Sequence, residues 1–104
     1  MKIELLTIPH CPGVEGARQV LRHLLRPIGE TFIETTIRNE EQAMATHFLG
    51  SPTIQINGQD IEPERRNDPA SFSCRTYAHG KDRLCRIPEE MLRQALEEAK
   101  KPTK

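Results

Sequence analysis

Apolar and polar positions follow two different spacings in the first part of the chain. Residues 2–8 form a nearly continuous apolar run that ends at Pro9, which is typical of a strand buried on both faces of a sheet. Between residues 14 and 25 the apolar side chains instead recur at helical spacing, with arginines on the opposite side, and Pro27 ends this pattern. The N-terminal region therefore predicts a strand followed by an amphipathic helix.

A second strand and a shorter helix are expected next. Residues 31–37 are rich in β-branched side chains and predict a strand. Asn39 followed by Gln42 is typical of a capping box, which predicts a helix that extends to about Phe48 and is closed by Gly50. Because the two predicted strands are joined through a helix, they should be parallel, with a right-handed crossover.

The clearest short-range signal is the Asn57-Gly58 pair. It separates the β-type segments 53–56 and 59–61. A type I′ turn requires positive φ at both central residues, and Asn-Gly is a favoured pair for such a turn. We therefore expect these two segments to form an antiparallel hairpin.

The remainder of the chain predicts a long loop and a final helix. Residues 62–87 contain two prolines and many charged side chains, and a loop of this length is usually functional or mobile. Pro88 begins a helical stripe that continues to Ala99, and residues 101–104 are expected to form a frayed basic tail. The order of elements predicts an α/β fold, a mixed βαβαββα sheet flanked by helices, in a single domain of residues 1–104.

Composition narrows the functional classes. Fifteen basic residues balance fifteen acidic ones, so no net field draws the chain to nucleic acid or to an anionic membrane. The sequence has no phosphate-binding loop or dinucleotide fingerprint, and no apolar run reaches transmembrane length. The N-terminus is too charged for a signal peptide, which predicts a cytoplasmic protein. Cytoplasmic thiols are kept reduced, so the three cysteines are expected to be reactive, metal-binding or inert rather than disulfide-bonded.

Cys11 is the strongest candidate for chemistry. It follows the first predicted strand and precedes Pro12, which is favoured in the first turn of a helix. A thiol at a helix N-terminus meets the partial positive charge of unpaired backbone N–H groups, and His10 adds positive charge when it is protonated. Both effects favour the thiolate, which is the nucleophile in disulfide exchange and a ligand for soft metals. The alternative is a small, partly buried residue that only packs.

Three motifs and the element order together resemble the thioredoxin and glutaredoxin superfamily. The motifs are Cys11-Pro12 after the first strand, Ser51-Pro52 before the hairpin, and Cys74-Arg75-Thr76-Tyr77 in the long loop. Within that superfamily the chain is similar to small bacterial thioredoxin-like proteins that have a single cysteine in the Cys-Pro motif. By element order the resemblance covers roughly residues 1–61 and 88–100.

The resemblance implies a thiol-disulfide oxidoreductase that acts through Cys11. It also implies a cis proline and a groove in which an extended substrate chain or glutathione lies beside the thiol and pairs with nearby backbone groups. The expected substrate-binding residues are His10, Pro12, Ser51, Pro52 and Thr53. The partners would be thiols or disulfides of proteins or small molecules. The resemblance requires no cofactor. Glutathione and a soft metal ion are the two ligands that the cysteines could bind.

The chain departs from the family at Val14, which stands where the second cysteine of a Cys-x-x-Cys motif would be. Either Cys11 acts as a monothiol, or Cys74 or Cys85 resolves its mixed disulfide, or the redox function is lost and the fold serves as a non-catalytic interaction module. Of the two loop cysteines, Cys74 is the expected second catalytic residue. A soft-metal site for Zn²⁺, Cu⁺ or Hg²⁺ is a further alternative, but the cysteine spacing is not a zinc pattern, so no metal ligand is assigned.

The long loop is also rich in basic side chains. They are a candidate site for an anionic ligand such as the carboxylates of glutathione, or else a solvated face, and they are Arg65, Arg66, Arg75, Lys81, Arg83 and Arg86. Three other residues are expected in surface or structural roles, namely His23, His47 and His79.

Overall fold

The computed structural model of the chain describes residues 1–100 and confirms the predicted mixed α/β fold. A four-stranded sheet has the order β2-β1-β3-β4, and its strands are β1 (Ile3–Thr7), β2 (Ile33–Thr36), β3 (Thr53–Ile56) and β4 (Gln59–Asp60). As expected, β1 is a central strand and is parallel to β2; on its other side it is antiparallel to β3. The tail predicted at residues 101–104 lies outside the described residues.

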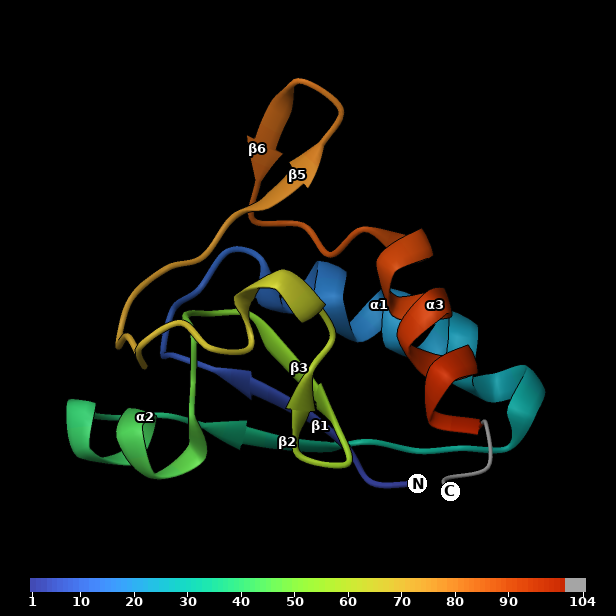
Figure 1. Cartoon of the computed structure of the whole chain (residues 1–104), viewed down its shortest axis with the longest axis horizontal. Coiled ribbons are helices and arrows are strands. Elements are labelled where there is room, and N and C mark those ends of the chain that lie inside the picture. The colour runs from blue at the N-terminus through green and yellow to red at the C-terminus, as the bar shows by residue number, and fades with distance from the viewer. Residues whose placement is uncertain (101–104) are drawn as a thin grey trace.

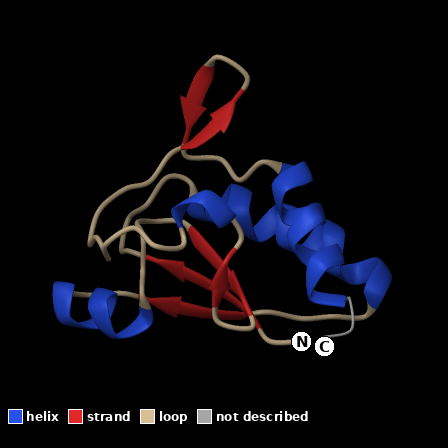
Figure 2. Cartoon of the chain, viewed as in Figure 1, coloured by secondary structure: helices blue, strands red, loops and turns tan. Residues whose placement is uncertain are grey.

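Three α-helices and two short 3₁₀ helices surround this sheet. They are α1 (Val14–Leu25), η1 (Arg26–Ile28), α2 (Glu40–Thr46), η2 (Pro63–Arg65) and α3 (Glu89–Lys100). Figure 1 shows α1 and α3 together on one side of the sheet, while α2 lies beyond the end of β2. The same arrangement can be followed by element type in Figure 2.

Two apolar cores form on opposite faces of the sheet, because successive side chains of a strand point in opposite directions. Leu5 belongs to the larger core, where it packs with Leu21 of α1 and Leu92 of α3. The neighbouring Leu6 belongs to a smaller core with Phe48, which follows α2. Each of these leucines is almost fully buried, and such burial contributes about 1.5–3 kcal/mol per side chain.

Local signals in the sequence produce the expected local structure. Asn39 caps α2, since its side chain accepts a hydrogen bond of 2.8 Å from the Gln42 N–H. The reciprocal bond of a capping box is shifted by one residue, because Gln42 accepts instead from the N–H of Arg38. At the β3–β4 hairpin, Asn57 and Gly58 both have positive φ, as a type I′ turn requires.

The expectation of a structureless loop over residues 62–87 is wrong. This segment contains η2 and a second hairpin, formed by β5 (Tyr77–His79) and β6 (Asp82–Leu84), which projects away from the main sheet in Figure 1. Each strand has only three residues, and β6 is exposed along its whole length. Because these short strands do not alternate apolar and polar residues, the hydrophobic pattern did not predict them.

Candidate functional site

Cys11 lies in the turn that connects β1 to α1. Its side chain is half-buried, and its carbonyl accepts a hydrogen bond of 3.3 Å from the N–H of Val14. On one side is His10, exposed and with a φ of 61°, in the left-handed region. On the other side is Pro12, which is exposed and precedes the helix, because α1 begins at Val14 with Gly13 as its N-cap. The helix thus starts slightly later than Pro12 predicted.

The segment before β3 is fixed against the end of β1. The peptide bond between Ser51 and Pro52 is cis, the form that the resemblance implies. The hydroxyl oxygen of Ser51 accepts a hydrogen bond of 3.1 Å from the N–H of Ile8, three residues before Cys11. The buried residues Ser51, Pro52 and Thr53 therefore support the turn that carries Cys11.

Ser51 is also paired with the segment that contains Cys74. Its N–H donates to the carbonyl of Ser73 at 2.8 Å, and its carbonyl accepts from the N–H of Arg75 at 2.9 Å, so Cys74 lies opposite Ser51 in a parallel bridge. Thr53 is part of β3 and pairs with Leu6. The protein's own chain thus pairs with the backbone of Ser51, where the resemblance implies a substrate chain.

The same segment is anchored by the buried side chain of Arg75. Its guanidinium forms a bidentate ion pair with Asp60, with N–O distances of 2.6 and 2.9 Å. A further nitrogen–oxygen distance of 3.1 Å joins Arg75 to Glu62, and another of 3.1 Å joins it to the hydroxyl of Thr53. Arg65 lies 3.9 Å from Glu62, which gives a network of two cationic and two anionic groups.

Tyr77 links this network to the cis proline. Its ring lies 4.4 Å from the guanidinium carbon of Arg75, and its hydroxyl donates a hydrogen bond of 2.6 Å to the carbonyl of Pro52. Burial raises the pKa of Tyr77 above its ordinary value of 10.0, so the hydroxyl stays protonated and can donate. Burial is the largest single influence and lowers the pKa of Arg75, but the hydrogen bonds to Asp60 and Glu62 and the charge interactions beside them together outweigh it and raise the pKa above its ordinary value.

Gly50 is required where the Arg75 segment approaches the sheet. It has a φ of +114°, and a methyl group added there would lie 2.8 Å from Cβ of Arg75. Both the backbone conformation and the close approach therefore favour glycine.

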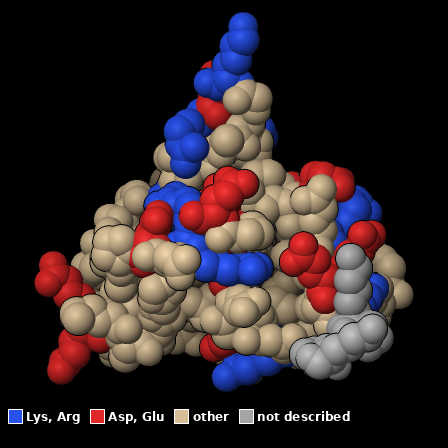
Figure 3. Space-filling view, in the orientation of Figure 1, with Lys and Arg blue, Asp and Glu red and all other residues tan. Residues whose placement is uncertain are grey.

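Half of the basic side chains of the loop already have partners within the protein. Arg75 is buried and paired with carboxylates, Arg65 is paired with Asp68 at 3.1 Å, and Arg66 donates to the carbonyl of Asp60 at 2.8 Å. The remaining basic side chains are exposed on or next to the β5–β6 hairpin, and they are Lys81, Arg83 and Arg86. Figure 3 shows basic side chains on the projecting hairpin.

Cys85 lies at the base of this hairpin and packs against Gly13. A methyl group added at Gly13 would lie 2.8 Å from the carbonyl oxygen of Cys85 and 3.3 Å from its Sγ. Cys85 is half-buried, and Ile87 two residues later is buried in the larger core. The structure thus brings the Cys85 segment to the Cys11 turn and the Cys74 segment to Ser51, and all three cysteines are free.

The histidines outside the Cys11 turn contact neighbouring groups. His47 has a φ of 55° at the C-cap of α2, and its Nε2 lies 2.8 Å from the carbonyl of Arg66. His79 Nε2 lies 2.7 Å from the carbonyl of Arg86. His23 Nε2 is 3.5 Å from Glu89. These contacts agree with the structural and surface roles expected for the three residues.

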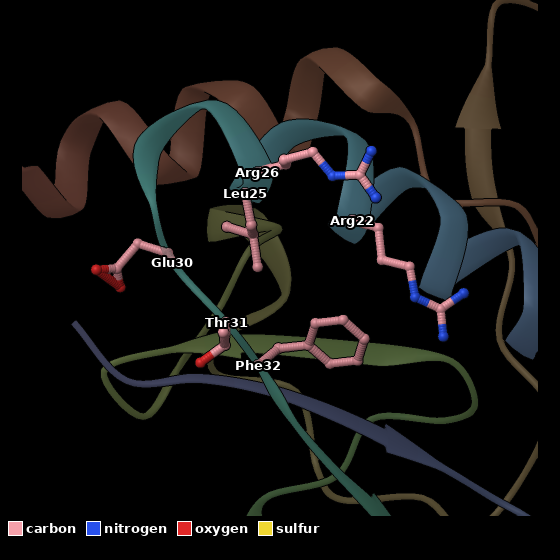
Figure 4. Close-up of a pocket in the computed structure, with 6 residues that line it drawn as sticks. All are labelled: Arg22, Leu25, Arg26, Glu30, Thr31 and Phe32. Atoms are coloured by element: carbon pink, nitrogen blue, oxygen red, sulfur yellow. The ribbon is translucent and has the colours of Figure 1, made fainter.

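The described residues contain no metal cluster at the cysteines. Within residues 1–100, no group of three or more His, Cys, Asp or Glu side chains is arranged to hold a metal ion. An open pocket of about 280 Å³, shown in Figure 4, lies between the end of α1 and the start of β2, and no cysteine lines it. In the same described part of the chain, no helix has the length and apolarity needed to cross a membrane.

Sequence reasoning missed the buried network and the contact between Gly13 and Cys85. The Cys74-Arg75-Thr76-Tyr77 motif marked this segment, in which Arg75 and Tyr77 are buried and Thr76 between them is exposed. A charged residue at a buried strand position contradicts the usual apolar pattern, so this alternation does not predict a strand by itself. Comparison with known protein families, characterised proteins and solved structures finds no match to this chain.

Proposed function

We propose that this chain is a thioredoxin-like thiol protein that performs thiol-disulfide exchange through Cys11, without a resident cofactor. The observation that carries the proposal is the position of Cys11 in the turn after β1, beside the cis-proline segment and the Cys85 segment. Cys11 lies between β1 and α1, Cys74 is bridged to Ser51, and Cys85 packs against Gly13.

The topology supports a thioredoxin-like fold for this chemistry. A parallel β1–β2 pair, an antiparallel β1–β3 pair and the β3–β4 hairpin follow one another in the element order on which the resemblance rests. The cysteine turn and the cis proline segment then meet at the end of β1, through the hydrogen bond between Ile8 and Ser51.

The proposed reaction begins with attack by the Cys11 thiolate on one sulfur of a disulfide. A new S–S bond forms to Cys11, the substrate S–S bond breaks, and the departing thiolate takes a proton from solvent. A second thiolate then attacks the Cys11 sulfur and releases the bound half of the substrate. The three free cysteines agree with a reducing compartment, so we place this reaction in the cytoplasm.

A small disulfide such as oxidised glutathione suits the site better than an extended protein chain. Strand-like binding requires free backbone donors and acceptors. In this chain Ser51 already uses both of its backbone groups, with Ser73 and Arg75. The turn around Cys11 is nevertheless partly exposed, and His10 and Pro12 beside it are exposed.

The test is the uptake of glutathione by the reduced full chain from oxidised glutathione. Peptide mass mapping over time gives the rate at each cysteine, with the exposed Cys74 as an internal reference. We expect Cys11 to react roughly tenfold faster than Cys74 or more, as an activated thiolate does. The C11S variant should lose the fast phase and the C74S variant should keep it. Equal rates at Cys11 and Cys74 would contradict the proposal.

A further inference from the structure

We propose that Cys85, rather than Cys74, is the resolving cysteine, and that oxidation forms an intramolecular disulfide between Cys11 and Cys85. This inference rests on the proposed function and assigns its second step. The carrying observation is the packing of the Cys85 carbonyl and sulfur against Gly13, inside the Cys11-Pro12-Gly13-Val14 turn.

Chain geometry places Cys11 close to the same point. Two peptide units separate Cys11 from Gly13, which limits the distance between their Cα atoms to about 7.6 Å. The hydrogen bond from Val14 to the Cys11 carbonyl closes the turn and shortens this distance further. Cys85 therefore lies next to the turn that carries Cys11, and a disulfide between them forms if the hairpin base moves so that their Cα atoms come within roughly 7 Å.

The two loop cysteines also differ in how firmly their backbone is held. Both neighbours of Cys74 are bonded to Ser51, and one of them is Arg75, whose side chain is buried in ion pairs. Cys85 instead follows the exposed strand β6. The backbone on the N-terminal side of Cys85 is therefore less firmly held than the backbone around Cys74, and it is the one that can adjust to form a disulfide.

In the resolving step, Cys85 displaces the glutathione that is bound to Cys11. The Cys85 thiolate attacks the Cys11 sulfur of the mixed disulfide, the S–S bond to glutathione breaks, and a second glutathione thiolate leaves and takes a proton. The net reaction reduces one oxidised glutathione to two thiols, while Cys11 and Cys85 are oxidised to a disulfide. A dithiol such as dithiothreitol then regenerates the two cysteines.

The experiment mixes the reduced full chain with one equivalent of oxidised glutathione and follows glutathione release and disulfide position by peptide mass mapping. We expect two glutathiones to be released and a disulfide between Cys11 and Cys85. C85S should stop at the mixed disulfide on Cys11, with one glutathione released, and C74S should behave as the wild type. A disulfide between Cys11 and Cys74, or a persistent mixed disulfide in the wild type, would overturn the inference while leaving the proposed function intact.

A pair of glycine variants tests the packing independently of the thiols. In G13A the added methyl would meet the Cys85 carbonyl at 2.8 Å and displace it, whereas in G16A nothing lies within 4 Å of the added methyl. We expect G13A to slow the second release by about tenfold, as overpacking of a close contact does, and to leave the first release unchanged. G16A should affect neither. Equal second-step rates in G13A and G16A would also overturn the inference, and a Cys11 that takes up no glutathione overturns the proposed function itself.

Discussion

The main sheet with its helices and the segment 62–87 are held in place by different interactions. The sheet body depends on distributed apolar burial, with residues such as Leu5, Leu21 and Leu92 in one continuous core. The segment 62–87 depends on a few specific attachments, above all the ion pairs of Arg75 and the hydrogen bond of Tyr77. Cys11 therefore belongs to the region held by distributed burial, whereas Cys74 and Cys85 belong to the region held by a few specific attachments.

The largest expected effect comes from removing the Arg75 charge. In R75M the buried carboxylate of Asp60 loses its bidentate partner, and breaking a buried ion pair in this way costs about 3–5 kcal/mol of unfolding free energy. Urea denaturation measures this loss. R86M is the matched control, because Arg86 is exposed on the same segment and should change stability by less than about 0.5 kcal/mol. Similar losses of unfolding free energy in R75M and R86M would show that segment 62–87 does not depend specifically on Arg75.

A smaller effect is expected from Y77F, which keeps the aromatic ring and removes only the hydroxyl. The carbonyl of Pro52 then loses its 2.6 Å hydrogen bond, at a cost of about 1–2 kcal/mol at neutral pH. Urea denaturation of Y77F against the wild type measures this cost.

The alkaline pH dependence of Y77F gives a second readout. Burial raises the pKa of Tyr77 in the folded protein. The stabilisation that its protonated hydroxyl provides is therefore fully present below the ordinary pKa of 10.0 and is lost as pH rises above that value. The difference in unfolding free energy between the wild type and Y77F should therefore decrease above pH 10. Tyr77 is the only tyrosine, so tyrosinate absorbance reports its ionisation directly. A tyrosine that ionises at its ordinary pKa in the folded protein would contradict this account.

The smallest effect is expected in the sheet body, at the ion pair between Arg18 and Glu34. The pair is partly exposed, with a nitrogen–oxygen distance of 2.6 Å, and the hydrogen bond from Arg18 lowers the pKa of Glu34 below 4.5. The ion pair therefore stabilises the folded protein above pH 4.5, and this stabilisation is lost as pH falls through the lowered pKa of Glu34.

E34Q should therefore be slightly less stable than the wild type at neutral pH, and the difference should vanish in acid. Thermal unfolding at several pH values measures it. The control is E30Q, since Glu30 makes no ion pair with the described residues. If E34Q lost as much stability as R75M, the sheet body would also depend on a few specific polar contacts.

Much of the sheet body could be predicted because its signals are local. The apolar run of β1, the Asn39 cap and the Asn57-Gly58 turn each depend on residues a few positions apart, and each has the expected structure. The position of Cys11 after β1 could also be predicted from this order, whereas the engagement of the Ser51 backbone by Ser73 and Arg75 could not.

The sequence by itself determined the mixed α/β order and the turn that carries the first cysteine, because hydrophobic period and turn chemistry are properties of neighbouring residues. Only the tertiary structure decided that Arg75 is buried and which loop cysteine meets Gly13. Arg75 is stable in the interior only because Asp60, 15 positions away, supplies a carboxylate there. No local pattern encodes such a pairing, since its free energy arises when two distant segments are desolvated together.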